Sequence, residues 1–137
     1  MPDVEFADAE AMVGAFLRSR LGVPVSTKVP NPRPARFARA WRTGGGTDNR
    51  AVETVQITVT CFAADSVTAS NDAAKAKHLL LNEYTAMPLV RGVTIQAGPY
   101  FDPDPDTNGD RYTVTAVMRV RARRDQAAAP AATTAAG

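Results

Sequence analysis

The sequence predicts an α+β protein in which a mixed sheet of four to five strands carries two helices on one face, in the order α-β-β-β-α-β-β. Three observations predict this class: an apolar stripe at helical spacing near the N-terminus, several segments of alternating apolar and polar residues, and an Ala-rich helical segment between them. With 137 residues, 45% hydrophobic and 22% charged, the chain can bury one core. We expect a single domain over residues 1–124 and a disordered Ala/Thr/Pro tail over residues 125–137.

The first half of the chain predicts a helix, a strand and a stiff connection. A helix is expected near Asp8–Leu21, where apolar residues recur every three or four positions. Asp8 suits the N-cap, and Gly22 suits the left-handed residue that ends the helix. Val23–Val29 alternates as a strand does, and the prolines of Pro30–Pro34 then predict an extended, rigid segment.

Two further strands are expected next. Phe37–Thr43 is unusual, because alternation puts Arg39 on one face and Arg42 on the other. Gly44–Arg50 is expected to form a flexible hairpin tip. Val52–Phe62 has the clearest alternation in the chain, with its Val, Ile and Cys residues on one face and its Thr and Gln residues on the other.

The second half predicts a helix over Ser66–Met87, capped by Asp65 or Ser66, and then strands at Val93–Ala97 and Asp110–Arg123. Small residues dominate one end of the apolar stripe of this helix, which suits close packing on a sheet. We expect both helices on the same face and a second face rich in Thr and Arg.

The residues with catalytic potential are few. Cys61 is the only cysteine, so no internal disulfide can form, and it lies on the apolar face of a predicted strand, where a thiol is typically inert. Nothing in the sequence brings His78 next to it. We therefore expect no enzyme activity, no catalytic residue and no cofactor.

One motif resembles a metal site. Asp104-x-Asp106-x-Asn108-Gly109 matches the opening of a calcium-binding loop, but the position of the closing glutamate is occupied by Thr115. A polar turn before a strand is the better interpretation, so no metal site is assigned. Weak calcium binding at Asp104–Gly109 stays open.

Charge is unevenly distributed along the chain. Basic residues concentrate between Arg18 and Arg50 and again from Arg119 to Arg124, while acidic residues gather at Asp3–Glu10 and Asp102–Asp110. These segments are either solvated faces or surfaces that attract a polyanion or an acidic protein. The N-terminus lacks the apolar segment of a secretion signal, and no apolar run is long enough to span a membrane.

A longer motif points to a family. The run Val25-Ser26-Thr27-Lys28-Val29-Pro30-Asn31-Pro32-Arg33-Pro34, followed by Phe37-x-Arg39-x-x-Arg42-Thr43-Gly44-Gly45, resembles tail terminator (tail completion) proteins of long-tailed phages of actinobacteria. The order of elements over residues 4–122 agrees in outline, and so does the closing strand that begins Arg111-Tyr112-Thr113.

The resemblance implies a structural protein of the virion, located at the head-proximal end of the tail and assembled in the host cytoplasm. Such proteins form a hexameric ring that caps the major tail tube protein, stops tube growth and provides the joint to the head-tail connector. DNA passes through the lumen without sequence-specific binding, and no membrane is involved. The alternatives are another neck or head-completion ring protein of the same virion and a small ligand-binding module.

Candidate contact residues follow from the charge pattern together with this resemblance. The expected subunit or tube contacts are Arg33, Arg39, Trp41, Arg42, Gly44, Gly45 and Arg50. Arg119 and Arg121 are expected to face the lumen and its DNA, and acidic residues of Asp102–Asp110 or of the first helix are candidate partners in a neighbouring subunit. The sequence does not assign the surface that meets the tube or the one that meets the connector, the order of ring formation and docking, or a role for the tail.

Overall fold

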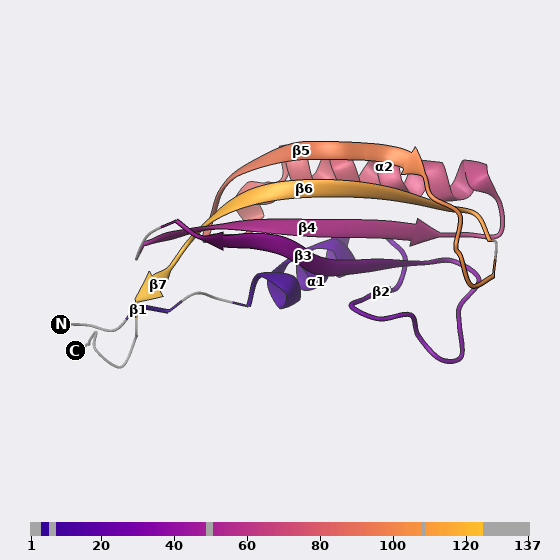
Figure 1. The fold of residues 1–137 in the computed structure, drawn as a ribbon, viewed down its shortest axis with the longest axis horizontal. Coiled ribbons are helices and arrows are strands. Elements are labelled where there is room, and N and C mark those ends of the chain that lie inside the picture. The colour runs from indigo at the N-terminus through magenta and orange to yellow at the C-terminus, as the bar shows by residue number, and fades with distance from the viewer. Residues whose placement is uncertain (1–3, 6–7, 49–50, 108, 125–137) are drawn as a thin grey trace.

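The computed structural model describes residues 4–5, 8–48, 51–107 and 109–124 (Figure 1). Its elements, in chain order, are β1 (Val4–Glu5), α1 (Ala9–Arg20), β2 (Val25–Ser26), β3 (Phe37–Thr47), β4 (Val52–Phe62), α2 (Ser66–Asn82), a 3₁₀ turn (Tyr84–Ala86), β5 (Val90–Phe101), β6 (Arg111–Arg121) and β7 (Arg123–Arg124). The predicted α+β class and the predicted order of its two helices and five sheet strands are confirmed. The expected tail, residues 125–137, lies outside the described residues.

Five strands form one mixed sheet in the spatial order β2-β3-β4-β6-β5. β2 runs parallel to β3, and every other neighbouring pair is antiparallel. The chain leaves β4 through α2, returns as the edge strand β5, and then inserts β6 between β4 and β5. β1 and β7 form a separate two-stranded pair beyond the end of β6 (Figure 1).

Both helices pack on the same face of this sheet, as predicted. Asp8 caps α1 by accepting a hydrogen bond from the amide of Ala11 at 3.1 Å, and Asp65 caps α2 through the amide of Thr68 at 2.8 Å. α1 contacts β2 and β3, whereas α2 covers β4, β5 and β6. The face of β4 that the sequence assigned to the core is fully buried: Val55, Ile57, Val59 and Cys61 are each 0% exposed.

Two predictions near the first sheet edge are wrong. The strand expected over Val23–Val29 shrinks to β2, because the chain turns away into the proline segment after Ser26. The hairpin tip expected from Gly44 instead continues β3 to Thr47, in register with Glu53–Gln56 of β4. A β-bulge between Arg42 and Gly44 absorbs one extra residue and lets the glycines remain in the ladder.

The second half also differs from the prediction in its boundaries. The helix expected to reach Met87 ends at Asn82, and the 3₁₀ turn follows it. β5 extends well beyond the expected Val93–Ala97. Register shifts between Val90 and Gly92, between Ile95 and Ala97, and between Ala97 and Tyr100 break the alternation along β5, so periodicity identified only a short part of it.

Gly45 provides a test of the extended hairpin. Its φ is +104°, and an added Cβ would lie 2.1 Å from the carbonyl oxygen of Thr54. We expect Gly45→Ala to lower the free energy of unfolding by about 2–4 kcal/mol, because the side chain meets both backbone strain and a backbone atom. Gly46→Ala is the matched control, because a Cβ there meets nothing within 4 Å. Urea denaturation measures both, and equal stabilities for the two variants would contradict the extended hairpin.

Candidate interaction surface

The sheet face opposite the helices is the candidate surface. There, Arg39 pairs in register with Thr60, and Trp41 pairs with Thr58. The guanidinium carbon of Arg39 lies 3.9 Å from the centre of the Trp41 ring, within the range of a cation–π contact. Nε of Arg39 also donates to the carbonyl of Thr27 at 2.7 Å. This arginine therefore lies over the indole at the β2–β3 edge and has no carboxylate partner among the described residues.

A threonine row runs across the middle of this face. Thr58, Thr60 and Thr113 are only 8%, 1% and 3% exposed, although no helix covers them. Larger side chains on the adjacent strand, Arg39 opposite Thr60 and Trp41 opposite Thr58, shield these threonines from water. Their hydroxyl groups are hydrogen-bonded: Thr60 and Thr113 share a hydrogen bond of 3.1 Å, and Thr113 donates to Asp102 at 2.9 Å. The sequence correctly predicted the direction of these side chains but not their burial.

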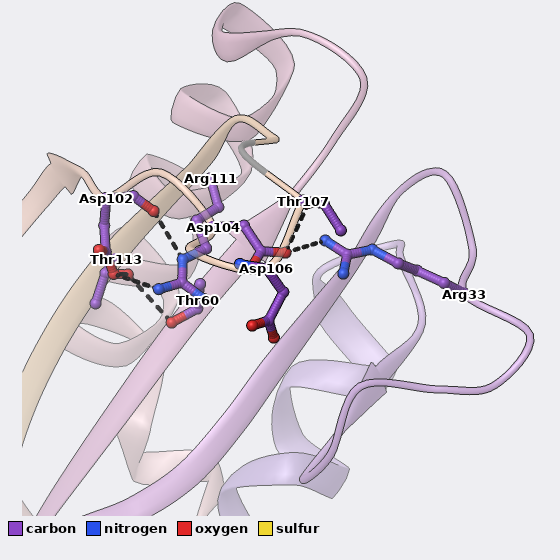
Figure 2. Close-up of polar contacts among 8 residues, drawn as sticks. All are labelled: Arg33, Thr60, Asp102, Asp104, Asp106, Thr107, Arg111 and Thr113. Carbon is purple, nitrogen blue, oxygen red and sulfur yellow. Dashed lines mark hydrogen bonds and ion pairs between the residues drawn. The ribbon is translucent and has the colours of Figure 1, made fainter.

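One end of this face is closed by residues 27–36 and by a second loop, whose described residues are 102–107 and 109–110 (Figure 2). Nη2 of Arg33 lies 2.6 Å from Oδ2 of Asp104, and its guanidinium carbon is 4.9 Å from the centre of the Phe62 ring. Phe62 stacks on Phe37 with a centroid distance of 4.3 Å. Arg33, predicted to contact a neighbouring subunit, thus links the two loops of its own chain.

Asp104 is the buried anchor of this closure, only 3% exposed. It accepts hydrogen bonds from the amide of Asp106 at 3.0 Å and from the hydroxyl of Thr107 at 2.9 Å. The amide of Asp106, together with Arg33 and Thr107, lowers the pKa of Asp104 to about 2, against the opposing effect of burial. Arg33 thus pairs with the Asp104 carboxylate, which would bind the metal ion if the Asp104–Gly109 motif formed a calcium site.

Two further ion pairs reinforce the same end of the molecule. Arg111 donates to the carbonyl of Asp102 at 2.7 Å and lies 3.3 Å from its carboxylate (Figure 2). Arg36 binds Asp72 of α2 in a bidentate pair at 2.8 and 2.7 Å, and Asp72 is 3% exposed. Two of the acidic residues that the sequence offered to a neighbouring subunit, Asp102 and Asp104, are therefore paired within the chain.

Arg42 lies on the helix-covered side, as the alternation predicted. Its Nη1 is 3.5 Å from the carboxylate of Glu53, which is 5% exposed, and its backbone amide donates to Glu10 of α1 at 2.9 Å.

The outer edge of β3 is only partly covered by another strand. β2 pairs only with Ala38 and Arg39. Within the described part of the chain, the outer edge of β3 from Ala40 to Thr47 has no partner strand.

The remaining predicted residues that the structure describes lie toward the other end of the sheet. Gly44 and Gly45 belong to β3, and Arg50 lies outside the described residues. Arg119 and Arg121 are exposed on β6, and no described carboxylate forms an ion pair with either. Sequence reasoning missed Arg91, also exposed and unpaired among the described residues, because the predicted strand began after it.

The chemical groups with catalytic potential lie apart from this surface. Burial raises the pKa of the Cys61 thiol to about 12. His78 is exposed on α2, with Nδ1 3.1 Å from the side-chain nitrogen of Asn82. Among the described residues, no three His, Cys, Asp or Glu side chains gather as metal ligands, and neither described helix has the length and apolar character to cross a membrane.

Comparison with known proteins gives no match: no protein-family model matches this chain, and no curated protein matches it.

The Arg33–Asp104 pair predicts a pH-dependent stability. The pKa of Asp104 is lower in the folded chain than the usual value of about 3.9, so its stabilising contribution is full above about pH 5 and is lost as pH falls toward 2. We expect Asp104→Asn to lower the free energy of unfolding by about 1–2 kcal/mol at pH 7 and by much less near pH 2.5. Urea denaturation at both pH values measures the difference, and a difference independent of pH would contradict this role.

Cys61 predicts an unreactive thiol. Because burial holds the pKa of the thiol near 12, the native protein at pH 8 should resist a disulfide reagent such as dithionitrobenzoate, and one thiol should react once the chain is unfolded in guanidinium. Absorbance of the released thiolate measures both rates. Rapid reaction of the folded protein would show that β4 does not bury this residue.

Proposed function

We propose that this chain is a structural subunit of a phage tail, which forms a hexameric ring that caps the tail tube, ends its growth and joins it to the head connector. The proposal assigns no catalytic residue and no cofactor. The ring lies at the head-proximal end of the tail in the virion, and DNA passes through it.

The observation that carries the proposal is where the family-like sequence block lies. Val25–Pro34 comprises β2 and the proline segment, and Phe37–Gly45 forms most of β3. Among the described residues, the block therefore occupies one of the two edges of the sheet, where the outer side of β3 beyond Arg39 has no partner strand, together with the adjoining part of the uncovered face. Unpaired strand edges and uncovered faces are surfaces through which proteins associate.

A closed ring also requires two different contact surfaces on each subunit, because its contacts are heterologous. The fold leaves several regions available for such contacts, among them the β2–β3 edge with Arg39 and Trp41 and the arginine-rich end of β6. The helices occupy only one face of the sheet, so the opposite face remains accessible to other proteins of the tail.

Electron microscopy of lysates from a phage that lacks the gene tests the function directly. A tail terminator predicts free heads and tails of excess, variable length, because tube growth no longer stops. Tails of normal length that fail to join heads would favour the alternative, a neck or head-completion ring protein. Complete infectious particles would contradict both.

Charge reversal on the uncovered face gives a residue-level test. Arg39→Glu should leave the fold intact, because the guanidinium of Arg39 forms no ion pair with a described carboxylate and interacts with the Trp41 ring and one backbone carbonyl, but it should prevent capping and give overlong tails. Arg42 is less suitable, because its reversal would also face the buried Glu53. Arg20→Glu is the matched control on the helix side, with an expected stability loss of at most about 1 kcal/mol.

Tail lengths measured by microscopy, with melting temperatures of both variants, decide the outcome. Normal tails that contain the Arg39→Glu protein would exclude this residue from the capping contact.

A further inference from the structure

The two ends of the sheet differ in their exposed charges: arginines predominate at one end, where Asp48 also lies and accepts a hydrogen bond from Thr54, and aspartates predominate at the other. At one end, Arg119 and Arg121 of β6 and the neighbouring Arg91 of β5 are exposed, and none has a carboxylate partner among the described residues. Nearby, a Cβ built at Gly92, which is paired with Arg119, meets nothing within 4 Å, so the surface beside Arg119 is open. We name Arg91, Arg119 and Arg121 the basic end.

The opposite end carries carboxylates without a cation. Asp102 and Asp104 pair with arginines of the chain, but the side chains of Asp106 and Asp110 have no cationic partner among the described residues. Figure 2 shows the Asp106 carboxylate pointing away from the Arg33–Asp104 contact. We name Asp106 and Asp110 the acidic end.

A pocket of about 410 Å³ opens at the acidic end. Asp110 lies on its wall together with Pro34, Ala35, Phe62 and Ala63. Thr107 and Gly109 also line the pocket. Its apolar residues and the single carboxylate suit an arginine side chain, whose stem packs on apolar groups while its guanidinium pairs with the acid. Arg33, which also lines the pocket, is neutralised by Asp104 and so opposes a second arginine only weakly.

The two ends cannot meet within one chain. β6 begins at Arg111, beside the acidic end, and finishes at Arg121, in the basic end. Eleven residues of extended strand separate them by about 35 Å. Complementary charges fixed at opposite ends of one subunit are suited to head-to-tail contact between subunits.

We propose that the basic end of one copy docks on the acidic end of the next copy, with an arginine of the basic end entering the pocket beside Asp110. This inference rests on the proposed ring and names its subunit contact. It differs from the expectation that Arg119 and Arg121 face DNA. A second copy accounts for both charged ends at once, whereas DNA phosphates would leave Asp106 and Asp110 without a partner.

Charge exchange between the two ends tests the contact. One variant carries Arg119→Glu and Arg121→Glu, a second carries Asp106→Arg and Asp110→Arg, and a third carries all four changes. Sedimentation velocity at about 100 μM protein in roughly 50 mM salt measures association, because low salt preserves interactions between exposed charges. Circular dichroism verifies that each variant folds, and Asp106→Arg alone replaces the second variant if that one does not.

We expect the wild-type protein to form a closed oligomer and each two-residue variant to associate at least tenfold more weakly. The variant with all four changes should recover the oligomer, and so should an equimolar mixture of the two weakened variants, which can alternate around a ring. Failure of both to recover, an undiminished oligomer in either two-residue variant, or a wild-type protein that stays monomeric would overturn the proposed contact.

A separate measurement identifies the DNA alternative and separates this inference from the proposed function. If Arg119→Glu with Arg121→Glu loses affinity for duplex DNA but associates normally, these arginines meet phosphates and the contact is wrong. If charge exchange fails while wild-type rings still cap tail tubes, the function stands without this contact. If charge exchange succeeds and the rings do not act on tubes, the contact stands and the proposed function fails.

Discussion

The helices cover only one face of the five-stranded sheet, and most other features of the molecule follow from this constraint. On the covered face, Val55, Ile57, Val59 and Cys61 of β4 and Val114, Ala116, Met118 and Val120 of β6 are completely buried in the core beneath the helices. The other face has no second layer, so it cannot be apolar without exposing a large hydrophobic patch. It is built instead from threonines that hydrogen-bond to one another, such as Thr60 and Thr113, and from an arginine lying on an indole. These groups are stable at a water boundary and remain available for contact.

Arginine–aspartate pairs provide the tertiary links that a second layer would otherwise provide. Arg33 with Asp104 fixes the proline segment to the loop after β5, and Arg36 with Asp72 fixes the residue before β3 to α2. In both pairs the carboxylate is buried and the guanidinium is partly exposed, so each aspartate depends on its arginine for compensation. The stacked rings of Phe37 and Phe62 lie beneath Arg33 and complete this end of the molecule.

The sequence predicted the elements well where a single period dominates. The alternation along β4 and the helical stripe near Asp8–Leu21 identified both the elements and their buried faces, because each element has one buried side. Boundaries failed where local signals conflict with tertiary pairing. Gly44–Thr47 has the composition of a turn, yet pairing with β4 extends the strand through it. Register shifts concealed the length of β5 in the same way. The charged sites were harder to predict, because an arginine's role depends on which acid the fold brings near it, as Arg33 shows.

Charged side chains that form ion pairs within the chain are weaker candidates for contact with a partner than those that do not. Arg33, Arg36, Arg42 and Arg111 stabilise their own chain, so their number in the sequence says little about partners. Among the described residues without an ion-pair partner, Arg39 lies on the uncovered face, three arginines lie at one end of the sheet with Asp48, and Asp106 and Asp110 lie at the other end. The excess of arginine at one end and of aspartate at the other gives the sheet a charge polarity along its strands. A subunit that must join a neighbour in one direction requires such polarity, since head-to-tail contact places unlike surfaces against each other at every interface.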